Sequence, residues 1–194
     1  MPSLVSKRIA AAVTQYESDD NLGVLLDILR DVARSNDADT LIRAAEAYRD
    51  RPEVVMPIYE RIIEERPSDA RALVTLANAY WITGRGPDVV GELAVRAKTA
   101  DPDNRAAWHL WALAESNVRD RVERWSQVTN RFPHDQLARA ALADNATSLA
   151  GAEHDPLALD LAITTYDGLL EEAQTPTQKR ALEQTLATLR GWKL

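Results

Sequence analysis

The sequence contains no cysteine among its 194 residues. This absence excludes disulfide bonds, thiolate nucleophiles and cysteine-ligated metal sites. Long apolar runs are also lacking, because no stretch approaches the roughly 18 consecutive apolar residues that a membrane-spanning helix requires. Glycine and proline are few, with 7 and 9 residues, and they occur at intervals rather than in clusters. Such spacing is typical of breaks between helices and excludes low-complexity linkers.

Clusters of basic residues are missing as well. The chain has 23 Lys and Arg residues against 30 Asp and Glu residues, which gives a formal net charge of -7. Such a surface repels phosphate backbones unless it carries a local basic patch, so we expect no nucleic-acid partner. The basic pair Lys7 and Arg8 follows apolar residues, which is unlike a signal peptide. We therefore expect a mature, cytoplasmic protein that does not insert into a membrane.

Motifs that carry catalytic chemistry are absent from the sequence. The two glycines of "GRGP" (Gly84–Pro87) lack the Lys-Ser/Thr that completes a phosphate-binding loop. No motif places a nucleophile on a strand-to-helix elbow. The three histidines, His109, His134 and His154, lie far apart and share no helix face, so they form no metal site. We expect no catalytic residues, no metal, no cofactor and no enzymatic activity.

Apolar residues at helical spacing, in contrast, extend along nearly the whole chain. Leu22, Leu25 and Leu29, for example, recur at steps of three and four residues, and eleven segments show this pattern. The pair Asp155-Pro156 is typical of a helix cap followed by a first-turn proline. No segment shows sustained alternation bounded by hairpin turns, so the sequence predicts no sheet. The fold class predicted is all-α.

The helical pattern repeats along the chain. Tyr16, Tyr48 and Tyr80 are separated by 32 residues each. Prolines that end helices recur at similar intervals of 35 and 31 residues (Pro67, Pro102 and Pro133). A period of about 34 residues built from two helices is the signature of a tetratricopeptide array.

Individual positions also resemble the tetratricopeptide repeat (TPR) family. In its first helix the family has a large residue, a small residue four positions on and an aromatic residue three further on. Leu73, Ala77 and Tyr80 match these positions, and Gly84 lies in the turn between the helices. The preceding repeat matches at Leu41, Ala45 and Tyr48. The resemblance covers nearly the whole chain and identifies it as a TPR-like protein.

The resemblance implies a right-handed α-solenoid in a single domain spanning residues 1–194. We expect five helix pairs and a capping helix, at residues 4–36, 38–66, 69–101, 105–132 and 136–173, with the cap at 176–190. Each pair is too small to bury its own apolar face, so neighbouring pairs must stack. Ala77 must then be small to let two helices approach, while Tyr80, Trp108 and Trp125 fill gaps in the core.

The family's usual binding surface is a concave groove lined by the first helices of successive pairs. By register, the resemblance places ten residues in this partner-binding groove: Ile42, Glu46, Arg49, Arg71, Val74, Asn78, Trp81, His109, Leu113 and Asn117. Asp39 and Asp144 fall on the same face.

The residue types in the predicted groove indicate which kind of ligand it can bind. Family members that clamp the C-terminal carboxylate of heat-shock chaperones use Lys and Asn on these helices. Asn78 stands at one such place, but Ile42 and Val74 stand where a clamp lysine is needed, which excludes that ligand. Val74, Trp81 and Leu113 instead favour an apolar or amphipathic ligand, with Trp81 as its anchor.

The leading hypothesis for function is a non-enzymatic adaptor or scaffold that binds a protein or peptide in the groove. One alternative is a TPR-type secretion or assembly chaperone with a dedicated client. Another is a structural repeat protein that forms homo-oligomers through its end helices. Scattered exposed apolar residues are normal on protein surfaces, so the groove residues could equally be ordinary surface residues.

Overall fold

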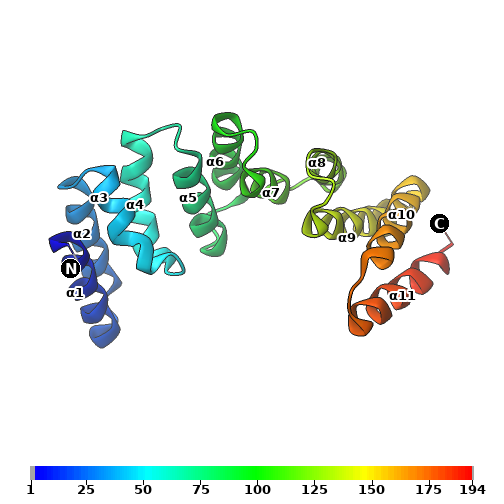
Figure 1. Ribbon diagram of the computed structural model, residues 1–194, viewed down its shortest axis with the longest axis horizontal. Helices are drawn as coiled ribbons and strands as arrows, with labels where there is room; N and C mark the ends of the chain where they lie inside the picture. Colours follow the sequence, from blue (N-terminus) through cyan, green and yellow to red (C-terminus); the bar gives the residue numbers. More distant parts are fainter. Residues whose placement is uncertain (1–2, 194) are drawn as a thin grey trace. The chain divides into compact units, whose positions relative to one another are not determined.

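The computed structural model describes residues 3–193 of the chain, which are helical almost throughout and contain no β-strand. One 3₁₀ helix, η1, separates two of the α-helices, and Figure 1 labels the α-helices in chain order. The α-helices are α1 (Leu4–Asp19), α2 (Leu22–Arg34), α3 (Ala38–Ala45), α4 (Pro52–Glu65), α5 (Ala70–Ile82), α6 (Pro87–Ala100), α7 (Arg105–Leu113), α8 (Val118–Arg131), α9 (Gln136–Glu153), α10 (Pro156–Glu172) and α11 (Pro176–Arg190), with η1 at Glu46–Tyr48. For the described residues, the prediction of an all-α chain with eleven helices is confirmed.

Short polar side chains determine where the helices begin. Asp37, Asp69, Asp135 and Asp155 each accept a hydrogen bond from a backbone N–H group in the first turn of the helix that follows. These bonds satisfy donors that have no partner within the helix. Pro156 follows Asp155 at the first helical position, where its missing N–H group carries no penalty. The expected cap at Asp155-Pro156 is therefore confirmed.

Two compact units make up the chain, with the boundary inside α7. Unit 1 is Met1–Leu110 and unit 2 is Trp111–Leu194. The single-domain assignment stays a prediction.

Within unit 1, helices pack both inside a pair and between neighbouring pairs. The contacts α1–α2, α3–α4 and α5–α6 lie within pairs, and α1–α3, α2–α4 and α4–α5 join successive pairs. Ile58, Ile62 and Leu73 are fully buried between these helices. Ala77 is also fully buried, as expected for the small residue at a close approach. Tyr80 is half-buried, and its hydroxyl donates a hydrogen bond of 2.7 Å to Glu60 Oε1 on α4.

Within unit 2, α9 packs against α8 and α10, and α10 packs against α11. Trp125 on α8 is 5% exposed and belongs to the core, as expected. The last helix contributes Leu186 and Leu189 to the core, so it covers the apolar side of the final pair. No helix between residues 3 and 193 combines the length and the apolar character that crossing a membrane requires.

Candidate functional site

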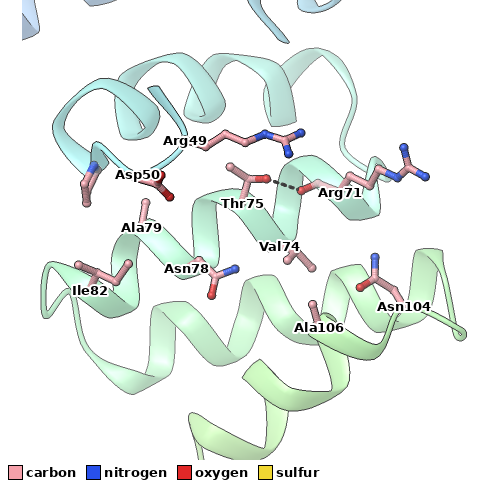
Figure 2. Close-up of a pocket in the computed structure, with 11 residues that line it drawn as sticks. Arg49, Asp50, Arg71, Val74, Thr75, Asn78, Ala79, Ile82, Asn104 and Ala106 are labelled. Atoms are coloured by element: carbon pink, nitrogen blue, oxygen red, sulfur yellow. Dashed lines mark hydrogen bonds between the residues drawn. The ribbon is translucent and has the colours of Figure 1, made fainter. Parts of the chain in front are cut away.

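A hollow in unit 1 lies over α5 and has a volume of about 680 Å³ (Figure 2). It lies between three successive segments of the chain. α5 supplies Arg71, Val74, Thr75, Asn78, Ala79 and Ile82, the turn after η1 and the first residue of α4 supply Arg49, Asp50 and Pro52, and the start of α7 supplies Asn104 and Ala106. We call this site the α5 hollow.

The α5 side of the hollow is one continuous helix face. Arg71, Val74, Asn78 and Ile82 are separated by three, four and four residues, which places them above one another on the helix surface. Leu73 on another face of α5 is fully buried in the core. Because the core holds that apolar face, the opposite face is presented at the surface.

The turn after η1 is held by a pair of ionic contacts. Arg51 Nη1 lies 2.5 Å from Glu17 Oε1, and Arg51 Nε lies 2.9 Å from Glu53 Oε1. The hydrogen bonds that Arg51 donates to Glu17 and Glu53 raise the pKa of Arg51 above its ordinary value, so its guanidinium remains charged. Arg51 thus fixes the turn that carries Arg49 and Asp50 on the wall of the hollow.

On the α7 side, Asn104 is both a wall residue and a helix cap. Its Oδ1 accepts a hydrogen bond of 3.2 Å from the backbone N–H of Ala107. Next to this cap, Trp108 Nε1 donates a bond of 2.9 Å to the Pro102 carbonyl, and Lys98 Nζ lies 4.2 Å from the centre of the Trp108 ring. Trp108 is half-buried under this cation, which makes it less enclosed than the expected core residue.

Charges are distributed unevenly around the α5 hollow. Arg49 Nη2 lies 3.0 Å from Glu46 Oε2, so the positive charge of Arg49 is partly balanced. The guanidinium of Arg71 is exposed and forms no ion pair with any residue from 3 to 193. The side-chain amide of Asn78 is likewise exposed, and within the same range it has no hydrogen-bond partner. The hollow therefore offers one unpaired cation and one unpaired amide to a ligand.

Tyr59 and Asp39 in unit 1 also have shifted pKa values. Burial raises the pKa of Tyr59 on α4 above its usual value, against a smaller opposing effect from the charge of Arg49, so its hydroxyl stays neutral. Asp39, expected on the groove face, pairs with Arg66 at 2.8 Å. The hydrogen bond from Arg66 lowers the pKa of Asp39, which is therefore ionised and engaged by the chain itself.

Four of the predicted groove residues come together in the hollow, namely Arg49, Arg71, Val74 and Asn78. Glu46 is adjacent through its ion pair with Arg49. The remaining predictions in unit 1 lie outside the set that lines the hollow: Ile42 on α3 and His109 on α7 are half-buried, and Trp81 is 41% exposed at the end of α5. The role of Trp81 as an anchor stays a prediction.

The last two predicted groove residues belong to unit 2. Leu113 at the end of α7 is 37% exposed. Asn117 caps α8, where its Oδ1 accepts hydrogen bonds of 2.9 and 3.1 Å from the N–H groups of Arg119 and Asp120. The oxygen of Asn117 therefore serves the start of its own helix.

Several lining residues were not identified from the sequence. Ile82 is the most informative, because it is 72% exposed and lies four residues after Asn78 on the same face. Helical spacing alone could have found it. Asp50, Pro52 and Asn104 could not be found in this way, because they lie in turns or at the start of a helix, at positions that depend on tertiary packing.

Known proteins provide a comparison for the fold. A scan against protein-family models finds no match, and a search of curated proteins finds none. Among solved structures, the chain is similar to a thermophilic TPR protein of Thermus thermophilus, with 15% identity, a TM-score of 0.54 and coverage of 96% of this chain and 98% of that one.

MamA is a second structural neighbour. The likeness has 12% identity, a TM-score of 0.56 and coverage of 90% of this chain and 95% of MamA. A MamA mutant gives 14% identity, a TM-score of 0.55 and coverage of 89% and 96%. Together with the helix pairs, these likenesses show that the chain has a TPR-like, all-helical fold.

Proposed function

We propose that the chain is a non-enzymatic scaffold that binds a protein or peptide partner in the α5 hollow. The observation that carries this proposal is the pair of unengaged polar groups, on Arg71 and Asn78, beside the exposed side chain of Ile82. A ligand that contacts all three gains hydrogen bonds and apolar burial from one helix face. The TPR-like fold supports the proposal, because stacked helix pairs create extended surfaces that repeat proteins use for binding.

The hollow can be blocked without disturbing the core. Asn78 is exposed, so an Asn78→Arg variant places a long side chain in the hollow while leaving the buried face of α5 unchanged. Asn130→Arg on α8 is the matched control, because Asn130 is also an exposed helical asparagine but lies in unit 2. Both variants change the net charge by the same amount.

The test is affinity capture from the native cell with the wild-type chain and both variants, quantified by mass spectrometry. We expect the proteins captured by the wild type to be lost with Asn78→Arg and retained with Asn130→Arg. Unchanged capture by Asn78→Arg, with the variant shown to be folded by circular dichroism, would contradict the proposal.

Trp81→Ala in the same experiment determines whether the site extends beyond the residues that line the hollow. Trp81 is exposed next to Ile82, so we expect the variant to fold normally. If partner binding is lost, Trp81 is part of the site as the sequence predicts. If binding is retained while Ile82→Ser abolishes it, Ile82 is the apolar anchor instead.

A further inference from the structure

The α5 hollow has two chemically different ends. Figure 2 shows Arg71 and Asn104 toward one end, with the guanidinium of Arg49 reaching in that direction, and Ile82, Ala79 and Asp50 toward the other. Asn78 and Val74 lie between them on α5. One end therefore presents cationic and amide groups, and the other presents an exposed apolar side chain beside a carboxylate.

The distance between these ends sets the length of the ligand. Arg71 and Ile82 are eleven residues apart on α5, which corresponds to about 16 Å at the α-helical rise per residue. An extended peptide advances about 3.3 Å per residue. Side chains of an extended chain alternate between two faces, so a segment that contacts both ends has its two contacting side chains about four or six residues apart.

Asn78 in the middle of the hollow distinguishes an extended ligand from a helical one. A side-chain amide can donate to a main-chain carbonyl and accept from a main-chain N–H group at the same time. A helical ligand has already paired these groups internally, whereas an extended segment leaves them free. The unengaged amide of Asn78 therefore favours an extended segment.

The charges determine which end binds which side chain. Among the arginines of the hollow, Arg49 already shares its charge with Glu46, while Arg71 forms no ion pair with the described residues. A carboxylate on the ligand can pair with Arg71 through two parallel hydrogen bonds. At the opposite end, Asp50 repels a second carboxylate, and Ile82 offers apolar contact.

We propose that the α5 hollow binds an extended peptide segment with an acidic side chain at Arg71 and an apolar side chain, about four or six residues away, at Ile82. This inference rests on the proposed function and specifies the chemistry of the ligand. The acidic group fixes the register of the segment, and the contact with Asn78 holds its main chain.

The probes are fluorescent peptides of five or seven residues, in which the two end side chains lie about four or six residues apart, and both termini are blocked so that only side-chain charge varies. One peptide carries Glu and Leu at its two ends with Gly and Ser between them, and a second has the reversed order. A second pair of peptides, again in both orders, has Lys in place of Glu. A third pair has Glu directly next to Leu. Binding to the full chain is measured by fluorescence anisotropy.

Of the two peptides with Glu and Leu at their ends, we expect one to bind more tightly than the other. It should also bind more tightly than the peptide with Lys in place of Glu and the peptide in which Glu is next to Leu. Arg71→Glu should weaken binding of the tighter Glu–Leu peptide by about tenfold or more, because a charge-assisted pair is replaced by repulsion, and it should improve binding of the Lys–Leu peptide. Ile82→Ser should weaken both peptides. Arg180→Glu on α11 is the control, because it makes the same charge change at an exposed residue of unit 2 and should leave binding within about twofold.

Three outcomes would overturn the inference. The Glu and Lys peptides could bind equally well, Arg71→Glu could fail to make the chain prefer the Lys peptide, or no peptide could bind. These outcomes are distinguishable from failure of the proposed function. If Asn78→Arg removes the captured partner while the peptides fail, the hollow is the binding surface and only the ligand chemistry is wrong. If Asn78→Arg leaves the partner bound, the hollow itself is not the site.

Discussion

Helices α5 and α9 hold the same place in their pairs but use their exposed faces differently. Each is the first helix of a pair and has a fully buried alanine, Ala77 or Ala143, followed by a polar residue. In α5 that polar residue is Asn78, whose amide has no partner among the described residues. In α9 it is Asp144, whose carboxylate accepts a hydrogen bond from the hydroxyl of Tyr166 on α10.

The C-terminal segment also contacts α9. A Cβ atom added at Gly151 would lie 3.4 Å from Cη2 of Trp192, so the indole ring lies against this glycine. Thr147 of α9 and Trp192 both line a hollow of about 440 Å³ with residues of α11. The comparison shows that one repeat position can stabilise the fold or remain available to a ligand. In α9 the chain engages its own polar group, whereas in α5 it leaves that group free.

The two tryptophans Trp125 and Trp81 give the largest expected contrast in stability. Trp125→Ala removes a side chain that is 5% exposed, so it should lower the free energy of unfolding by about 3–5 kcal/mol. Trp81→Ala removes a side chain that is 41% exposed at the end of α5, so its cost should be below about 1 kcal/mol. Urea unfolding measures both, and similar losses would mean that the end of α5 is part of the core.

The second largest contrast in stability is expected between substitutions at the matched positions Asp144 and Asn78. Asp144→Ala leaves the hydroxyl of Tyr166, which is 8% exposed, without its acceptor, so we expect a loss of about 1–3 kcal/mol. Asn78→Ala breaks no hydrogen bond within the described chain and should change stability by less than about 0.5 kcal/mol. Thermal unfolding of the two variants side by side tests the difference, and equal losses would show that Asn78 is structurally engaged.

Removal of the tryptophan in the C-terminal segment should have a smaller effect. Trp192 is half-buried against α9, so Trp192→Ala should cost about 1 kcal/mol. Lys193→Ala is the control, because Lys193 is exposed beside it. Hydrogen exchange around Gly151 should rise only in the tryptophan variant. Unchanged exchange would mean that the segment does not cover α9.

The smallest expected effect on stability near neutral pH comes from Tyr80 and Tyr166, whose hydroxyls donate hydrogen bonds to carboxylates. Burial, followed by the hydrogen bonds to Glu60 and Asp144, raises the pKa of both Tyr80 and Tyr166 to about 12. The unfolded chain ionises first, near 10, so the free energy of unfolding should be unaffected below about pH 10 and should fall between about pH 10 and 12. Tyr80→Phe and Tyr166→Phe should each reduce that fall in alkaline urea unfolding. An unchanged fall in both variants would contradict these shifts.

Local signals in the sequence were sufficient to predict the helices. The Asp caps, the first-turn prolines and the steps of three and four residues act within one or two turns, so their effects do not depend on the rest of the fold. The end of α3 is an exception. Glu46–Tyr48 forms a 3₁₀ helix, followed by the turn that Arg51 holds through Glu17 on α1. That contact joins residues 34 positions apart, so it cannot be predicted from helical periodicity.

The candidate site was predictable only in part, for the same reason. Arg71, Val74 and Asn78 follow from the register of one helix, and Ile82 follows from the same register once the face is extended by a turn. Asp50 and Asn104 reach the hollow through the packing of neighbouring helices. Asn117 shows the opposite case, because its position matches the groove register while its oxygen caps α8.

The most direct test of the central claim compares two equally exposed apolar side chains. Ile82 in the α5 hollow is 72% exposed, and Leu157 at the start of α10 is 78% exposed. A photo-crosslinking amino acid placed at each position reports which one contacts the partner in the native cell. We predict a crosslinked partner from position 82 and none from position 157. A crosslink from position 157 with none from position 82 would contradict the claim.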